Sequence, residues 1–320
     1  MSKKKITSIG GQAVIEGVMM RGPHKIAIAV RKPDGEIILD ESDVKAKGAW
    51  LKVPIIRGVV SFFSSMVIGV KALTFSAKFF DTEEDEKKSS DVAKENDASN
   101  KEKEKKNKNG ENDMPEWAIY VSVLVSLLIS VGLFMVLPNV IANFAVPDKE
   151  SNVIMYNVVE SMIKIAIFLG YLVAVSQMND IKRVFEYHGA EHKSIFCYEN
   201  GEELTVENVK KYSRFHPRCG TSFLLFVIII SIIVFSLLGV HENPFVNIGL
   251  RLLFLPLVAG ISYEIIKFAG RSTSKYITWL NEPGKWLQRL TTREPDDSQI
   301  EVAIASLKAV IPENEEDDLW

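Results

Sequence analysis

The chain has 320 residues and a formal net charge of −3 at pH 7, and 47% of its residues are hydrophobic. These apolar residues are gathered into long uninterrupted runs, which is typical of a membrane protein. No folded-looking segment carries the basic excess that nucleic-acid binding requires, so we exclude nucleic acid as a partner. Two cysteines are too few for a disulfide framework, and we expect free thiols or metal ligands.

Residues 1–53 are predicted to form a cytoplasmic β-rich segment. The stretch KIAIAVRKPDGEIILDE (25–41) has two β-rich runs around a Pro-Asp-Gly turn, which predicts a β-hairpin. The preceding stretch, GGQAVIEGVMMRGP, has neither the phosphate-loop nor the dinucleotide-binding spacing. It favours a strand and turn in which glycines relieve backbone crowding. In the functional alternative, the side chains held against the histidine region described below are Glu16, Arg21 and His24.

Two contrasting segments follow. Residues 54–80 have a helical pattern, but Arg57 and Lys71 bracket an apolar core of only about 13 residues, short of a membrane span. We therefore predict an interfacial or re-entrant helix. A fifth span is the competing interpretation, and it would place the hairpin outside the cell. Residues 81–113 have almost no large apolar side chains, which predicts a disordered charged linker.

Residues 114–275 are predicted to form a domain of four transmembrane helices, because four runs have the length that a bilayer requires without a charge at their centre. In the second run, Glu160 and Lys164 are spaced to pair on one helix face. The expected spans are Trp117–Leu137, Met155–Gln177, Thr221–Val240 and Ile248–Lys267.

Lysine and arginine orient these spans, since short loops rich in them stay in the cytoplasm. The loops at 138–154 and 241–247 contain one lysine, Lys149, whereas the loop at 178–220 is strongly basic. We therefore expect a multi-pass protein of the cell membrane with both termini in the cytoplasm. The basic residues of the 178–220 loop are Lys182, Arg183, Lys193, Lys210, Lys211, Arg214 and Arg218.

Residues 276–320 are predicted to form cytoplasmic helices and an acidic tail. The stretch NEPGKWLQRLTTREPDDSQIEVAIASLKAVI is typical of two short amphipathic helices. The second should begin after Pro295 with Asp296 or Asp297 as its N-cap. Its apolar stripe should contain Ile300, Ile304 and Leu307. The expected fold class is therefore a mainly α-helical integral membrane protein with a cytoplasmic α+β lobe.

The chemistry concentrates in EYHGAEHK, where His188, Glu191 and His192 form the pattern HxxEH. On a helix, the two imidazoles lie on one face at a spacing that suits Zn²⁺ or another divalent metal. The same inverted motif occurs in inverzincin metallopeptidases, which makes Glu191 a candidate general base. The alternative is a solvated helix whose histidines pack or pair with Glu186 and Glu191.

A catalytic zinc needs a third protein ligand. His216 and Cys219, in FHPRCG, are the preferred candidates, ahead of Glu264 in the fourth span. If the second span continued as an unbroken helix, His188 would lie ~15 Å beyond the membrane, which counts against Glu264. Cys197 lies off the histidine face and is interpreted as a small buried residue.

Four stretches resemble the YqhQ family of bacterial membrane proteins, which are regarded as predicted metal-dependent enzymes. They are GGQAVIEGVMMRGP, EYHGAEHKSIFCYE, FHPRCGTSF and NEPGKWLQRLTTREPDDSQIEVAIASL. The resemblance covers nearly the whole chain except residues 81–113. It implies a cell-membrane location and a metal site, but no substrate. The matching polar positions are His188, Glu191, His192, His216 and Cys219.

Two functions follow from these patterns. The first is a zinc-dependent hydrolase at the cytoplasmic membrane face, with Glu191 as general base and a peptide or lipid-linked substrate. The second is a non-enzymatic scaffold or assembly factor, with a structural zinc or without a metal, that docks a partner protein. Transport is disfavoured because the spans are few and show no inverted repeat.

Overall fold

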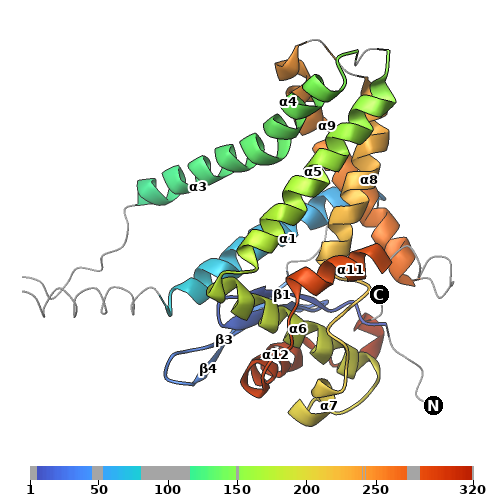
Figure 1. Ribbon diagram of the computed structural model, residues 1–320. Helices are drawn as coiled ribbons and strands as arrows, with labels where there is room; N and C mark the ends of the chain where they lie inside the picture. The colour runs from blue at the N-terminus through green and yellow to red at the C-terminus, as the bar shows by residue number, and fades with distance from the viewer. Residues whose placement is uncertain are drawn as a thin grey trace, which may run out of the picture.

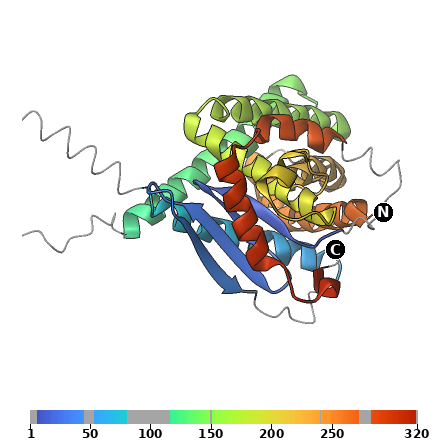
Figure 2. The same cartoon turned by 90° about the horizontal axis from the view of Figure 1, so that it is seen from below.

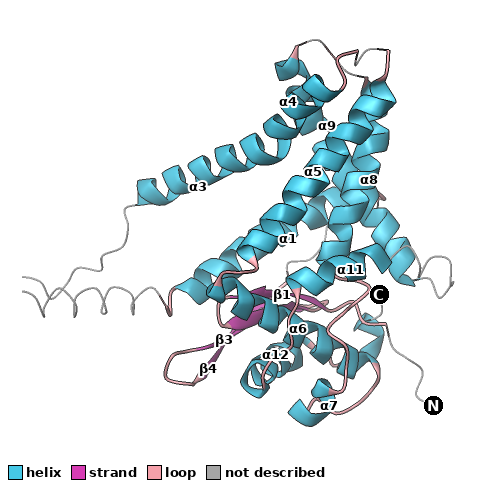
Figure 3. Cartoon of the chain, viewed as in Figure 1, coloured by secondary structure: helices cyan, strands magenta, loops and turns pink. Residues whose placement is uncertain are grey.

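The computed structural model describes residues 6–44, 53–80, 116–148, 151–239, 241, 243–271 and 282–318. Within these ranges the chain is mainly helical. Its N-terminal part forms a four-stranded antiparallel sheet, which lies below the long helices in Figures 1 and 3. The predicted linker at 81–113 lies outside the described residues.

The sheet contains the predicted hairpin and the glycine-rich stretch, in the order β1-β2-β3-β4. The hairpin is confirmed, and Gly35 in its turn has φ 89°, a conformation that glycine adopts without strain. The strand-and-turn interpretation of the glycine-rich stretch is also confirmed, since it forms the first two strands. The strands are β1 (Gly10–Val14), β2 (Gly17–Arg21), β3 (Lys25–Arg31) and β4 (Ile37–Asp43).

Helices cover both faces of this sheet. Helices α6 (Asn179–Glu199) and α12 (Asp297–Val310) pack on one face, and α12 crosses the strands diagonally (Figure 2). Alternating side chains explain the two layers, since Val18 and Met20 join the core beneath α6 and α12, whereas Met19 contributes to the opposite core. We call the sheet together with α6, α7 (Val206–Lys210) and α12 the lobe.

The two helices predicted near the C-terminus are present, and the Asp296 cap is confirmed. Helix α11 spans Glu282–Thr291, and α12 begins after Asp296, whose side chain accepts from the Gln299 N–H in a capping box. The predicted stripe of α12 is buried against the sheet and α6. A short 3₁₀ helix, η3 (Glu315–Asp318), follows.

The chain is a multi-pass membrane protein, because four helices in the described residues are long and apolar enough to cross a bilayer. This set of four differs from the predicted spans, because it includes α1 and does not include α8 (Gly220–Leu238). In α8 the apolar run, at 223–238, is shorter. A π-helical turn, η2 (Gly132–Val136), links α3 (Glu116–Val131) to α4 (Leu137–Ala145). The four are Ile56–Ala77 (α1), Leu124–Ala145 (α3 to α4), Val153–Val175 (α5) and Phe245–Ala269 in α9 (Pro244–Arg271).

Helix α1 lies between the sheet and the membrane helices. Its first turns pack closely on α9, where Gly58 meets Gly260, and its last turns pack on the sheet through Ala72. The side chains of Met66, Val67 and Val70 are more than half exposed. An interfacial position for this helix stays a prediction.

The connection between α5 and α6 decides where the histidines lie. Helix α5 ends at Val175, and the extended backbone of Met178 precedes α6. The break turns α6 across the lobe beneath the bundle instead of letting it continue along α5 (Figure 1). The unbroken helix considered from the sequence is therefore absent, and His188 lies beside the beginning of α8.

Candidate metal centre

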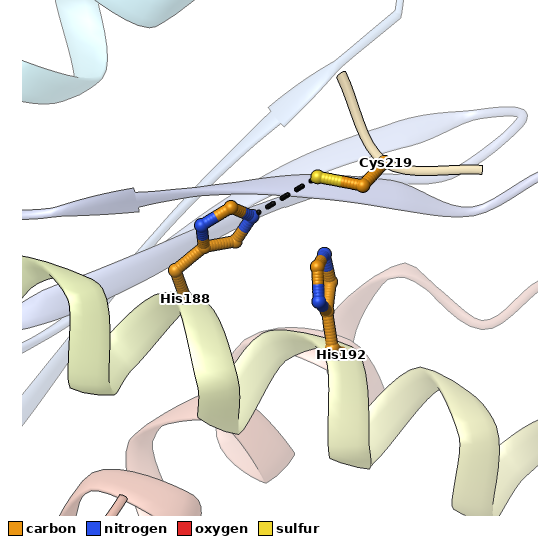
Figure 4. Close-up of side chains that lie close together, drawn as sticks. All are labelled: His188, His192 and Cys219. Atoms are coloured by element: carbon orange, nitrogen blue, oxygen red, sulfur yellow. Dashed lines mark hydrogen bonds between the residues drawn. The ribbon is translucent and has the colours of Figure 1, made fainter. Parts of the chain in front are cut away.

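Three potential ligands converge where the lobe meets the membrane helices. His188 and His192 project from one face of α6, and Cys219 is the N-cap residue of α8 (Figure 4). Their ligand atoms all lie within 4.8 Å of one another, and the Cys219 Sγ is 3.3 Å from the His188 Nε2. The four-residue spacing predicted this geometry for the histidines, and Cys219 is the third member that the sequence proposed.

The second ring nitrogen of each histidine is held by a backbone carbonyl. The Nδ1 of His188 lies 2.8 Å from the Thr291 oxygen, and the Nδ1 of His192 lies 2.5 Å from the Arg214 oxygen. A carbonyl only accepts, so each Nδ1 must carry a hydrogen, and Nε2 is the atom that offers a lone pair whenever the ring is neutral. Metal-binding histidines are usually oriented in this way.

Charge favours a thiolate at Cys219. Burial raises the pKa of its thiol, but the neighbouring His188 and His192 outweigh burial and lower the pKa well below its usual value. Burial likewise lowers the pKa of His188, but the thiolate opposite raises it to about 9. Because metal ligation requires a thiolate and a neutral imidazole, an ion would displace the imidazole proton.

Glu191 lies beside this group on the same helix and is only 5% exposed. Its Oε2 is 3.9 Å from the His188 Nε2, and the backbone of Gly11 lies against its side chain. Burial raises the pKa of the Glu191 carboxyl, although the two histidines oppose the effect. Gly11 permits the contact because a Cβ there would lie 3.0 Å from the Glu191 Cγ.

A cavity of about 430 Å³ opens on these side chains. Strand β1 forms one wall, α6 forms another, and Gly220 and Thr221 at the beginning of α8 complete it. The ligand group, Glu191 and His216 all line this cavity. The arrangement can therefore accept a small group beside three converging ligand atoms.

His216 lies next to the group but outside it. Its ring centroid is 5.6 Å from that of His192, and its Nε2 is 3.6 Å from the Glu199 Oε2. Gln288 fixes its backbone by bonding both its N–H and its carbonyl at 2.8 Å. Burial lowers the pKa of His216 to about 4.

The remaining predicted residues have other partners. Glu264 forms an ion pair with Arg57 of α1, and its Oε1 lies 2.6 Å from the Arg57 Nε. Cys197 is fully buried in the lobe core, where burial raises its pKa to about 11, as its interpretation requires.

The three residues of the functional alternative for the glycine-rich stretch have different surroundings. Glu16 forms an ion pair with Arg183 and accepts from the Tyr187 hydroxyl at 3.2 Å, so it ties the β1–β2 turn to the histidine helix. His24 is exposed and pairs with Asp317 at 3.1 Å, whereas burial lowers the pKa of Arg21.

Sequence reasoning missed three groups that shape the site: the Thr291 and Arg214 carbonyls and the Gln288 amide. No sequence signal identifies a carbonyl partner, because every residue type carries one. Gln288 projects from the predicted amphipathic helix at 282–291, but only the fold shows that it reaches His216.

A family model described as "Protein of unknown function (DUF1385)" matches residues 53–313. The uncharacterized protein YqhQ of Bacillus subtilis (strain 168) is 36% identical over 323 residues, which covers 97% of this chain and 95% of that protein. The chain belongs to the DUF1385 family. No solved structure matches it. Neither family nor relative is described by a metal or a reaction, so the metal-dependent activity that the resemblance implied gains no support from them.

Proposed function

We propose that this member of the DUF1385 family is a zinc-dependent hydrolase that acts at the cytoplasmic face of the cell membrane. One observation carries the proposal: three converging ligand atoms open on a cavity that also holds a buried carboxylate outside the ligand group. Catalytic zinc sites have three protein ligands and an open position, whereas structural sites have four protein ligands.

The donor set fits zinc. Two imidazole nitrogens and one thiolate are ligands that Zn²⁺ prefers, and the carbonyls of Thr291 and Arg214 hold the Nδ1 atoms, so the Nε2 atoms are directed to the site. Zn²⁺ in such a site supplies Lewis acidity and lowers the pKa of water towards ~7. His188 and His192 would hold the ion through Nε2, and Cys219 through Sγ.

Glu191 is the proposed general base. Its Oε2 lies 3.9 Å from a ligand nitrogen, and the Gly11 backbone packs against its side chain. A carboxylate in this position can accept the proton that water loses on attack and return it to the leaving group.

The cytoplasmic assignment rests on the basic residues between α5 and α8, because such loops are retained on that side of the membrane. The lobe and the candidate centre belong to this loop and to the two terminal segments that pack against it. A substrate that is anchored in the bilayer could therefore reach the cavity from the membrane surface.

The test compares Glu191→Gln with Glu186→Gln, a matched change on the same helix. Purified protein in vesicles is analysed for zinc and for cleavage of a fluorescence-quenched peptide library. We expect Glu191→Gln to retain about one zinc per chain and to lose activity by at least about 100-fold. Glu186→Gln should retain both. Full activity of Glu191→Gln, or its complementation of a deletion strain, would exclude the proposed base.

A scaffold with a structural zinc is the second candidate, and the position of His216 favours it. A rotation of that ring away from Glu199 would add a fourth ligand and close the site. In that case Glu191→Gln would leave function intact, while His216→Ala would release zinc.

A further inference from the structure

One wall of the cavity is a strand edge. Residues 9–13 line the cavity, and they include most of β1. In the part of the chain that the structure describes, β1 ends the sheet and pairs with β2 alone. Its other edge has no partner strand among the described residues, and α6, which carries His188 and His192, packs on the adjoining face of the sheet.

The register shows which backbone groups belong to this edge. Along an antiparallel pair, successive residues direct their N–H and C=O alternately towards the partner strand and away from it. The Gly22 N–H bonds the Lys25 carbonyl, so by this alternation Met20 bonds β3 and not β1. Gly11 lies opposite Met20, and its N–H therefore points away from β2. By the same alternation, the backbone groups of Ala13 also point outward.

The edge has room beside it. Gly10 and Gly11 are both exposed. A Cβ built on Gly10 would meet no described atom within 4 Å. Two adjacent residues without side chains therefore let another backbone approach the strand closely.

We propose that the substrate is an extended polypeptide segment that adds to the free edge of β1 and presents a peptide bond to the group of His188, His192 and Cys219. This inference rests on the proposed hydrolase function and names its substrate class. Strand addition is a common mode of peptide recognition, in which backbone hydrogen bonds supply affinity whatever the side chains are.

The Gly11 contact links binding to the reaction. A peptide carbonyl that accepts the Gly11 N–H lies beside Glu191, since a Cβ on Gly11 would be 3.0 Å from the Glu191 Cγ, and the Glu191 carboxylate accepts a proton from water. In the balanced step, the water oxygen bonds to the carbonyl carbon and the peptide C–N bond breaks. The proton that Glu191 accepts is then transferred to the leaving amine.

The geometry favours a peptide over a lipid chain. The strand edge offers donors and acceptors at regular intervals, which an acyl chain cannot use. Cys219 caps an apolar membrane helix, so a bound segment lies at the end of the bundle. The segment that fits is the part of a membrane protein that flanks one of its own spans.

The test uses three hydroxamate probes on the full-length, zinc-loaded protein in detergent. The first is a hydrophobic tripeptide hydroxamate, the second is the same probe with N-methylated backbone amides, and the third is a dodecyl hydroxamate. Zinc content is measured first, and binding is measured by calorimetry. A protein without zinc would contradict the proposed function itself, whatever the probes do.

With zinc present, N-methylation should weaken binding about tenfold or more, because the outward β1 groups lose their partners. Equal binding of the two peptide probes would overturn strand addition while leaving the metal centre intact. Tighter binding of the dodecyl probe than of the tripeptide would favour a lipid substrate. Absence of binding by all three probes would also overturn the inference.

A variant pair locates the effect. Gly10→Val adds a side chain beside the free edge, while Asp40→Val adds the same side chain on β4, the opposite edge strand. We expect Gly10→Val to weaken the tripeptide probe about tenfold and to leave acetohydroxamate, which has no strand-forming part, unchanged. Asp40→Val should leave both unchanged, and equal effects of the two variants would contradict the assignment to β1.

Discussion

Two regions of this protein bury polar groups, and they do so in opposite ways. Between α5 and α9, Glu160 is 1% exposed and pairs with Arg251 and with Lys164, while Arg251 also bonds Asn157 at 3.3 Å. Each charge in this membrane cluster has an opposite charge or a hydrogen-bond partner. Around α6, the ligand atoms of the metal group converge on one another and on a cavity.

The difference separates a structural cluster from a binding site. Buried donors and acceptors that satisfy one another hold helices together, and they leave no bonding capacity for a ligand. Two imidazole nitrogens and a thiolate that face one another are all acceptors once they are unprotonated, so they need a cation or protons between them. The following predictions test this distinction.

The largest effect should follow from His188→Ala. Loss of a group that hydrogen-bonds to a metal ligand lowers metal affinity by up to roughly 100-fold. Removal of one of the three ligands themselves should lower zinc affinity by more than that. Zinc per purified chain, measured by elemental mass spectrometry, should fall from about one to near zero. Cys197→Ala is the matched control, and it should keep its zinc because that thiol lies in the lobe core.

The two cysteines should differ in reactivity by about a thousandfold at pH 8 once zinc is removed. A thiol whose pKa is about 11, as for Cys197, is only about one part in a thousand ionised at that pH, whereas Cys219 is a thiolate. Labelling with iodoacetamide and peptide mapping measures the difference. Rapid labelling of Cys219 before any chelator is added would contradict bound zinc and favour a free thiolate–imidazolium pair.

Glu160→Ala should destabilise the membrane domain by about 3–5 kcal/mol, because Arg251, which is only 5% exposed, would stay buried without its anion. Unfolding in detergent measures the loss. Zinc per folded chain should not change. Loss of zinc without loss of stability would contradict the assignment of Glu160 to a structural cluster that is separate from the metal group.

The smallest effect should come from Gln288→Leu. This change removes both bonds that hold the His216 backbone, and the same loop carries the Arg214 carbonyl that orients His192. Zinc affinity should fall about tenfold, which is the smaller end of the loss expected when a group that supports a metal ligand is removed. A chelator competition assay measures it, and unchanged affinity would show that the loop holds its position without Gln288.

Much of this arrangement follows from local sequence patterns. The hairpin around Gly35, the capping of α12 by Asp296 and the shared face of His188 and His192 each depend on residues close together in the chain. The Glu160–Lys164 pair follows in the same way from its four-residue spacing, and its N–O distance is 3.0 Å. Such features are set by backbone geometry within one element.

Long-range contacts were beyond the sequence. From the sequence, Glu264 was a candidate ligand ranked behind His216 and Cys219, whereas the fold pairs it with Arg57, which lies 207 positions earlier in the chain. The sequence also left open whether the second span continued as an unbroken helix, because the three residues at 176–178 turn the chain without proline or glycine. Without that turn, neither Cys219 nor β1 could be placed beside the histidines.

Zinc K-edge X-ray absorption on the purified full-length protein tests the central claim most directly. The account predicts one sulfur at about 2.3 Å, two imidazole nitrogens at about 2.0–2.1 Å and one further light atom from solvent. In Glu191→Gln this spectrum should be unchanged. A folded protein without zinc, or a site whose four ligands all come from the protein, would contradict it.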